Sequence, residues 1–267
     1  MAGWWFDVDV GFKTYLCITL SAFAGWAPFL LLDALRAAAA GGGGGGRLAR
    51  FAVRHSLRPV AGGGDGDNPA LRSLAWRMVR RNFALLLPLA LAGSPVLAAL
   101  LPDAPVDWLA FGCQLPLVFA LDDVCFWAYH RALHANKGWY ARFHKPHHVF
   151  TRPFAVVSHA THPLEMALQS VGAMSGPLLL GMPRRAFWCW LALRQWQGIE
   201  DHCGYELPCS PSSLLRRAKF PFAWALWGGS DFHDEHHAKF NGNYASVFPA
   251  IDWAFGTLLA GSGTKKK

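Results

Sequence analysis

Charged residues are scarce in this chain of 267 residues. Asp, Glu, Lys and Arg together make up 16% of it, against roughly 25% in an ordinary soluble domain. Hydrophobic residues make up 53%, including 13 Trp and 19 Phe. Because the apolar residues come in long runs, the composition argues against a water-soluble domain and indicates a membrane protein.

Several other features are missing. The six Cys are scattered and form no CxxC pair, so nothing indicates a disulfide framework. The first ten residues contain two Asp and no Lys or Arg, unlike a cleaved signal peptide, which predicts an uncleaved anchor. No convincing strand pattern occurs, and the Gly runs lack the strand–turn–helix setting of a dinucleotide-binding motif.

Three apolar runs are long enough to cross a bilayer as helices: 15–35, 83–101 and 106–128. Two weaker runs, 163–182 and 186–199, predict a further hairpin that either spans fully or is re-entrant. We therefore expect an all-α integral membrane protein built from transmembrane helical hairpins.

The net charge of +8 comes largely from one connecting segment. Residues 36–81 contain nine Arg against Asp65 and Asp67, and excess Arg between spans marks the cytosolic side of a membrane. This charge does not indicate nucleic-acid binding, since no basic soluble face is visible. The poly-Gly run 41–46 predicts a flexible linker over 37–70. The resulting division is an N-terminal membrane anchor (1–36), a basic Gly/Arg-rich cytosolic linker (37–82) and a catalytic domain (83–260).

Histidine is concentrated in one part of the chain. Eleven of the twelve His lie between positions 130 and 237, and eight of them form one HxxxH and two HxxHH patterns. Residues at i, i+3 and i+4 share a helix face, and neutral imidazole is a common metal ligand. Since so many ligands exceed the needs of one tetrahedral ion, they predict a dimetal site in a histidine-rich helical cap. Its predicted ligands are His130, His134, His144, His147, His148, His202, His233, His236 and His237.

Other residues near these patterns have different predicted roles. Asp123 lies seven residues before His130 on the same helix face, where its carboxylate could orient that imidazole; the alternative is a buried Asp paired elsewhere. His159 and His162 are predicted to be outer-shell or structural residues. His55 stands alone in an Arg-rich stretch and has no predicted role.

The chemistry of an all-imidazole site narrows the function without fixing it. Imidazole suits Fe, Cu and Zn alike, but nitrogen-rich, thiolate-free ligation of two metals fits a non-haem di-iron centre that activates O2. A different class of protein, a membrane metal-binding or transport protein, would place its ligands in mid-span along a pathway. The predicted ligands lie at or beyond the ends of the spans, which favours an enzyme.

The order of the histidine patterns resembles the fatty acid hydroxylase and sterol desaturase superfamily over about residues 115–257. Finer strings are similar to C-4 methylsterol monooxygenases, and the string 200–205 also resembles the cholesterol 25-hydroxylase group. The strings that carry the resemblance are Asp123–His134, His144–His148, His162–Glu165, Asp201–Tyr205 and Asn243–Ser246.

The resemblance implies a multi-pass protein of the endoplasmic reticulum membrane with a cytosolic active site. It also implies two iron ions, O2, and electrons from NAD(P)H through cytochrome b5 or a reductase. The implied reaction is oxidation of the C-4 methyl group of a sterol intermediate. The alternative within the class is hydroxylation or desaturation of another lipid, at a sterol side chain, a sterol ring or a fatty acyl chain.

Overall fold

The computed structural model describes residues 8–41, 46–58 and 64–260 of the chain. Within these ranges the protein is helical, and one isolated bridge between Ser56 and Tyr205 is its only β-type pairing. The predicted all-α class is therefore confirmed.

The α-helices are α1 (Val8–Ala40), α2 (Arg47–His55), α3 (Pro69–Leu100), α4 (Trp108–Ala135), α5 (Lys137–Trp139), α6 (Lys145–His148), α7 (Pro163–Leu179), α8 (Arg184–His202), α9 (Pro211–Arg217), α10 (Ala223–Leu226), α11 (Ser230–Lys239) and α12 (Pro249–Ala254). The shorter helical turns are η1 (Asp65–Asp67), the π-helix η2 (Tyr140–His144) and the 3₁₀ turn η3 (Ala155–His159).

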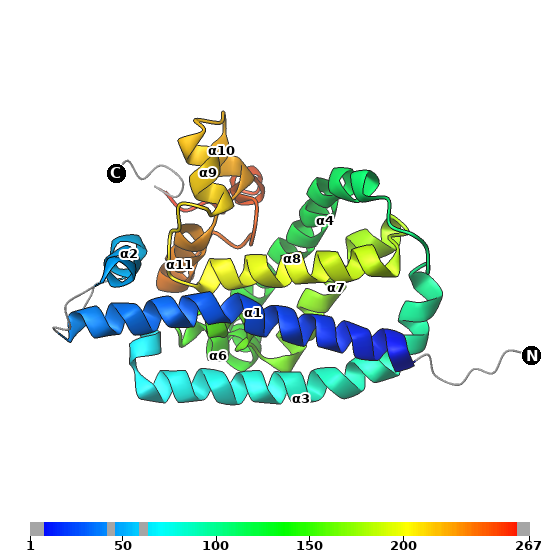
Figure 1. Ribbon diagram of the computed structural model, residues 1–267, viewed down its shortest axis with the longest axis horizontal. Helices are drawn as coiled ribbons and strands as arrows, with labels where there is room; N and C mark the ends of the chain where they lie inside the picture. Colours follow the sequence, from blue (N-terminus) through cyan, green and yellow to red (C-terminus); the bar gives the residue numbers. More distant parts are fainter. Residues whose placement is uncertain (1–7, 42–45, 59–63, 261–267) are drawn as a thin grey trace, which may run out of the picture.

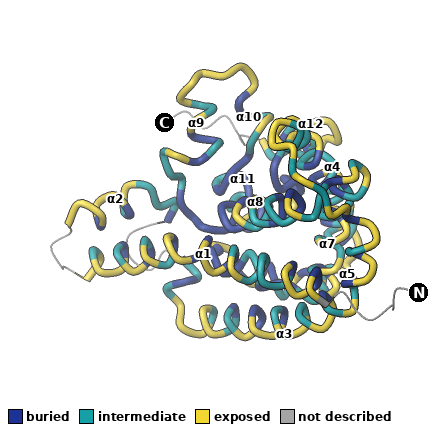
Figure 2. The backbone as a smooth tube through the Cα atoms, turned by 45° about the vertical axis from the view of Figure 1, so that its right-hand side comes forward, coloured by how far each residue is buried: buried dark blue, intermediate teal, exposed yellow. Residues whose placement is uncertain are grey.

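Three helices of the described chain are long and apolar enough to cross a membrane: α1, α3 and α4. Helix α1 has 33 residues, which corresponds to about 50 Å at 1.5 Å per residue, more than the ~30 Å of a bilayer core. Large apolar side chains point outward from these helices, including Leu20, Leu89 and Leu109. The outer faces of α1 and α3 are accordingly exposed in Figure 2. An apolar outer surface is what lipid solvation requires.

The two longest helices, α1 and α3, run antiparallel. Helices α1 and α3 lie side by side (Figure 1). The Gly11 backbone N–H donates to Ser94 Oγ at 2.9 Å, and Trp26 packs edge-on against Trp76. A Cβ at Gly11 would lie 2.2 Å from the Ala90 carbonyl oxygen, so only glycine permits this approach. The C-terminal end of α1 and the N-terminal end of α3 therefore lie at the same end of this helix pair.

The prediction of a flexible linker over 37–70 is wrong for those residues of this range that the structure describes. Helix α2 buries Ala49 and Ala52, and the Leu57 backbone N–H donates to the Gly204 carbonyl oxygen at 3.0 Å. Helix α3 begins at Pro69, capped by Asn68, far ahead of the expected start of this span. Small apolar residues between the arginines supply the buried face, a signal that the Gly and Arg content obscures.

Helices α7 and α8 form the predicted hairpin over 163–199. The turn between them lies at the far end of the bundle, where Arg184 Nη2 and Nε donate to the carbonyl oxygens of Ala98 and Leu101, both at 2.8 Å. Trp190 Nε1 donates to the Ala173 carbonyl oxygen at 2.7 Å and ties the two helices together. Neither helix is among the three long apolar ones. The hairpin thus runs from the histidine end to the α3 C-terminus and back.

Candidate metal centre

All nine predicted ligands come together, and they divide into two groups. Within each group the ligand atoms all lie within 4.8 Å of one another. We call the first group cluster A and the second cluster B. Cluster A consists of His130, His134, His144, His148 and His236, and cluster B of His147, His202, His233 and His237. Eight of the nine are buried, and His134 is half-buried. The site therefore draws on α4, η2, α6, α8 and α11.

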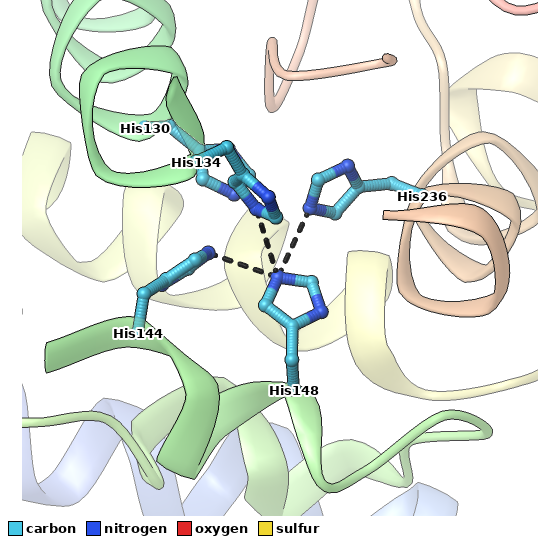
Figure 3. Close-up of side chains that lie close together, drawn as sticks. All are labelled: His130, His134, His144, His148 and His236. Atoms are coloured by element: carbon cyan, nitrogen blue, oxygen red, sulfur yellow. Dashed lines mark hydrogen bonds between the residues drawn. The ribbon is translucent and has the colours of Figure 1, made fainter. Parts of the chain in front are cut away.

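Cluster A converges on one nitrogen atom. His148 Nε2 lies 3.1 Å from His134 Nε2, 2.9 Å from His144 Nε2 and 3.2 Å from His236 Nε2, as the dashed lines of Figure 3 show. A neutral imidazole nitrogen carries either one proton or one lone pair, so it cannot form three hydrogen bonds at once. The convergence is better explained by a shared ion.

Cluster B has the same spacing. His202 Nε2 lies 3.3 Å from His147 Nε2 and 3.1 Å from His233 Nε2, which is 3.2 Å from His237 Nε2. Nitrogen ligands placed about 2.1 Å from one ion lie roughly 3.0–3.4 Å from their neighbours in octahedral or tetrahedral shells. Both clusters therefore have the spacing of ligand shells, and the residues fit a dimetal centre.

The protonation state of the imidazoles also fits metal binding. Burial lowers the pKa of His147 to about 4 and that of His236 to about 3. Burial, reinforced by neighbouring imidazoles, also lowers the pKa of His202, His233 and His237 well below the ordinary value. These rings are therefore neutral at physiological pH, which is the form that coordinates a metal.

Each HxxHH segment serves both clusters. From His144-x2-His147-His148 the first and last rings enter cluster A and the middle ring enters cluster B. From His233-x2-His236-His237 the first and last rings enter cluster B and the middle ring enters cluster A. The rings at i and i+4 belong to one cluster, and the ring at i+3 turns toward the other. The outer rings of each HxxHH segment therefore share a cluster with the middle ring of the other segment.

Backbone carbonyl groups orient the rings. The Nδ1 atoms of His130, His202, His236 and His237 lie 2.7–2.8 Å from the carbonyl oxygens of Tyr244, Gly198, Gly242 and Phe150. Because a carbonyl oxygen only accepts, each Nδ1 carries the proton and each Nε2 presents its lone pair to the cluster. Gly242 has φ +117°, and a Cβ there would lie 2.6 Å from the Thr257 carbonyl oxygen. Glycine therefore allows the turn that supports His236.

Asp123 does not orient His130 directly, so that prediction is wrong and its alternative holds. Its carboxylate accepts the backbone N–H groups of Ser246, Val247 and Phe248 at 2.6–3.1 Å. Seven helical residues rise about 10 Å, farther than an Asp side chain reaches. Asp123 instead anchors the loop whose Tyr244 carbonyl oxygen accepts the His130 proton.

Glu165 is the orienting carboxylate that the sequence analysis missed. It lies in the first turn of α7, is buried, and places Oε2 3.1 Å from His144 Nδ1. A carboxylate beside a ligating imidazole raises its basicity and fixes the ring. The only signal in the sequence was its position in the His162–Glu165 string, and that string does not indicate that Glu165 contacts His144.

Replacing Glu165 by glutamine should weaken metal binding at cluster A. The carboxylate charge beside His144 disappears while the side chain keeps its size, so we expect a ~10–100-fold loss of metal affinity or activity. Titration of the metal-free protein, followed by metal analysis, measures the loss. Glu206→Gln, which removes a carboxylate paired with Arg216, is the control. Equal affinities in the two variants would contradict the assignment.

The other three histidines lie outside the clusters. His162 caps α7, accepting the Leu164 backbone N–H on Nδ1 at 3.1 Å, and packs against Phe143. In the described structure no ring contact or hydrogen bond joins it to a predicted ligand, so of its two predicted roles, outer-shell or structural, helix capping corresponds to the structural one. His55 Nδ1 lies 3.0 Å from the Glu206 carbonyl oxygen. His159 lies beside the clusters and lines the cavity described next.

An apolar cavity of about 530 Å³ opens beside the clusters. His130, His144, His147, His202 and His233 line one end of it. From there it extends between α3, α7 and α8 toward the far end of the bundle, where its lining is apolar: Leu97, Met174, Phe187 and Leu191. Leu89 and Val96 of α3 line it and are exposed, so the cavity reaches the apolar outer surface. A lipid in the bilayer could enter it sideways.

The fold and the site together define a helical membrane protein with two imidazole clusters at one end of a lipid-sized cavity. The fatty acid hydroxylase family model matches residues 115–257, more than half of the chain and all nine cluster histidines. The chain therefore belongs to the fatty acid hydroxylase family.

Individual relatives agree with this assignment. Methylsterol monooxygenase 2-2 of Arabidopsis thaliana is 36% identical over 187 residues, 68% of this chain and 66% of the relative. Methylsterol monooxygenase 2-1 of the same plant is 33% identical over 199 residues, 68% of this chain and 70% of the relative. A very-long-chain aldehyde decarbonylase of Oryza sativa is 39% identical over 153 residues, 56% of this chain and 54% of the relative. The chain thus spans about half to two thirds of the length of most of these relatives. No solved structure matches the chain.

Proposed function

We propose that this protein is a membrane-bound, non-haem di-iron oxygenase that oxidises the C-4 methyl group of sterol intermediates with O2. The observation that carries the proposal is the pair of all-imidazole clusters at one end of an apolar cavity that reaches the lipid-facing surface. The sterol class is supported by the names of the methylsterol monooxygenase relatives. Electrons would come from NAD(P)H through cytochrome b5 or a reductase, and the location would be the endoplasmic reticulum.

The residues of the chain have separable tasks in this reaction. The nine neutral histidines would hold two iron ions, which supply the oxidation of an unactivated C–H bond that no side chain achieves alone. Backbone carbonyl groups and Glu165 keep the rings aimed. The apolar walls exclude water and hold the hydrocarbon next to the clusters.

Two other functions remain as alternatives. Within the class, the substrate could be another lipid, and the aldehyde decarbonylase relatives show that the family includes other named activities. From a different class, a metal transporter would need ligands along a path through the membrane. Here the ligands gather in one buried group beside a cavity and do not line a path through the membrane, which favours the oxygenase.

Turnover and metal content should be measured on one purified sample. We expect two metal atoms per chain, iron in the active form, and O2-dependent addition of one oxygen atom to a 4-methylsterol. Zinc can replace iron in overexpressed protein because it binds imidazole at least as well as ferrous iron. A sample with full activity and no more than one metal would refute the two-metal site. If an iron-loaded sample leaves 4-methylsterols unchanged but oxidises another lipid, the sterol assignment is wrong and that lipid class is the substrate.

The orientation of the helices gives a further expected result. The Arg-rich segment before α3 should lie in the cytosol with the metal centre, and the loop between α3 and α4 should lie in the lumen. A glycosylation site inserted between Leu101 and Asp107 should therefore be modified, and one inserted between α1 and α2 should not. The reverse pattern would place the metal centre in the lumen.

A further inference from the structure

A chain of hydrogen bonds leads from α1 into the cavity and ends at Gln195. Trp26 Nε1 donates to Ser158 Oγ at 3.4 Å, and Ser158 Oγ lies 2.8 Å from His159 Nδ1. His159 Nε2 lies 3.1 Å from the side-chain amide of Gln195. His159 is further fixed by the edge of Trp26, whose ring centroid is 5.1 Å away. His159 and Gln195 both line the cavity, yet neither belongs to a cluster.

Among the residues that the structure describes, only one of the two polar atoms of the Gln195 amide has a hydrogen-bond partner. The bond to His159 is the one hydrogen bond that Gln195 forms with its side chain among the described residues. The second atom of the amide is therefore left for a molecule in the cavity. An amide group in an apolar cavity gains little unless it finds such a partner.

The character of that partner follows from His159. Burial lowers the pKa of His159 to about 4, so the ring is neutral and has one N–H and one lone pair. Ser158 Oγ also lies 2.8 Å from the Ala155 carbonyl oxygen, which can only accept, so the single Ser158 proton is used there. His159 Nδ1–H therefore donates to Ser158 Oγ, and the lone pair on Nε2 accepts an N–H of the Gln195 amide. The carbonyl oxygen of Gln195 is then left for the cavity, and an uncharged hydroxyl group can donate to it.

The charges in the cavity wall disfavour an anionic partner. Arg194 is the one Lys or Arg among the described residues of the wall, and its guanidinium already pairs with the Asp122 carboxylate. Asp201 and Glu165 add two further carboxyl groups to the same wall. A lipid with a carboxylate or phosphate head would meet no free cation here.

We propose that Gln195, held in place by His159, binds the hydroxyl group of an uncharged lipid and sets the position of its hydrocarbon body in the cavity. This inference rests on the proposed function, because it takes the cavity as the substrate site. Seven residues, or two helical turns of about 10 Å, separate Gln195 from His202 on α8. A lipid held there by its hydroxyl has its polar end on the side of the clusters and its tail toward the apolar far end. Oxidation then falls near the polar end of the substrate.

Binding measurements without O2 test this proposal independently of turnover. The probes are 4α-methylcholestanol and its analogue without the 3-hydroxyl group, and octadecanol and octadecane as a second pair. One net hydrogen bond is worth about 1 kcal/mol, so wild-type protein should prefer the hydroxylated member of a pair by roughly fivefold. Gln195→Leu and Gln195→Met should bind both members equally. His159→Phe, which keeps the aromatic packing, should reduce the preference.

The control is Ser170→Ala, which removes a hydroxyl group of the cavity wall whose proton already goes to the Met166 carbonyl oxygen. This variant should keep the hydroxyl preference, and metal content should be unchanged in every variant. Hydroxyl-dependent binding without O2-dependent product would refute the oxygenase and leave this inference standing. A preference that survives in both Gln195 variants, or its absence from both wild-type pairs, would overturn the inference. Tighter binding of stearate than of octadecanol would also overturn it.

Discussion

His147→Ala and His236→Ala should each reduce turnover by more than about 100-fold, beyond the ~10–100-fold effect of outer-shell partners. His147 belongs to cluster B and His236 to cluster A. Each ring supplies a nitrogen whose place no neighbour can take, because every other imidazole is committed to its own cluster. The two variants should therefore lose different metals, and the metal content of each should fall from two toward one.

Metal analysis and turnover on the same membrane-inserted protein check this result. The apolar surfaces of α1, α3 and α4 are untouched by either change, so insertion should be normal. His55→Ala is the matched control, because that ring bonds to the Glu206 carbonyl oxygen away from both clusters. Near-normal turnover in both cluster variants would mean that the histidines are structural or serve transport.

Asp123→Ala should have the largest effect on stability. The substitution leaves two buried backbone N–H groups, those of Ser246 and Val247, and the half-buried N–H of Phe248 without their acceptor. Each such group costs about 1–3 kcal/mol, so the free energy of unfolding should fall by on the order of 3 kcal/mol or more. The loop also carries the carbonyl group that orients His130, so cluster A should lose metal affinity as well.

Thermal unfolding in detergent measures this change. Asp103→Ala is the control. Asp103 is exposed, and its ion pair to Arg184, at the opposite end of the bundle, is long at 3.8 Å. Asp123→Asn keeps one carbonyl acceptor and should lie between the two. If Asp123→Ala unfolds at the temperature of the control, the loop is held by other contacts, such as those from Asp252 to the backbone of Tyr244 and Ala245.

The sequence predicted which histidines come together because helix spacing is a local property. Residues at i, i+3 and i+4 face one way whatever the rest of the chain does, so three short patterns sufficed to name the rings. His202 had no such pattern and depended on its surrounding string. What spacing could not show is the division of each HxxHH between two clusters. That division depends on how η2, α6 and α11 face each other across the site.

The errors have a common physical cause. Asp123 and Glu165 each act on a partner that is distant in the chain, a loop more than 120 residues later for Asp123 and His144 for Glu165. The linker was misjudged because the small apolar face of α2 lies among arginines and becomes buried only where α2 packs against α1 and bonds to the segment after α8. Such long-range contacts leave no periodic trace in the sequence.

The shared use of the HxxHH segments also sets the order in which the protein can mature. Cluster A needs α4, η2, α6 and α11, and cluster B needs α6, α8 and α11, so neither set of imidazoles is complete before α11 has been synthesised. Before α11 is made, cluster A lacks one of its five imidazoles and cluster B lacks two of its four. Assembly of the full site therefore waits for the last of its helices to pack against α8. Ions bound by both clusters would then join segments of the chain that were synthesised far apart in time.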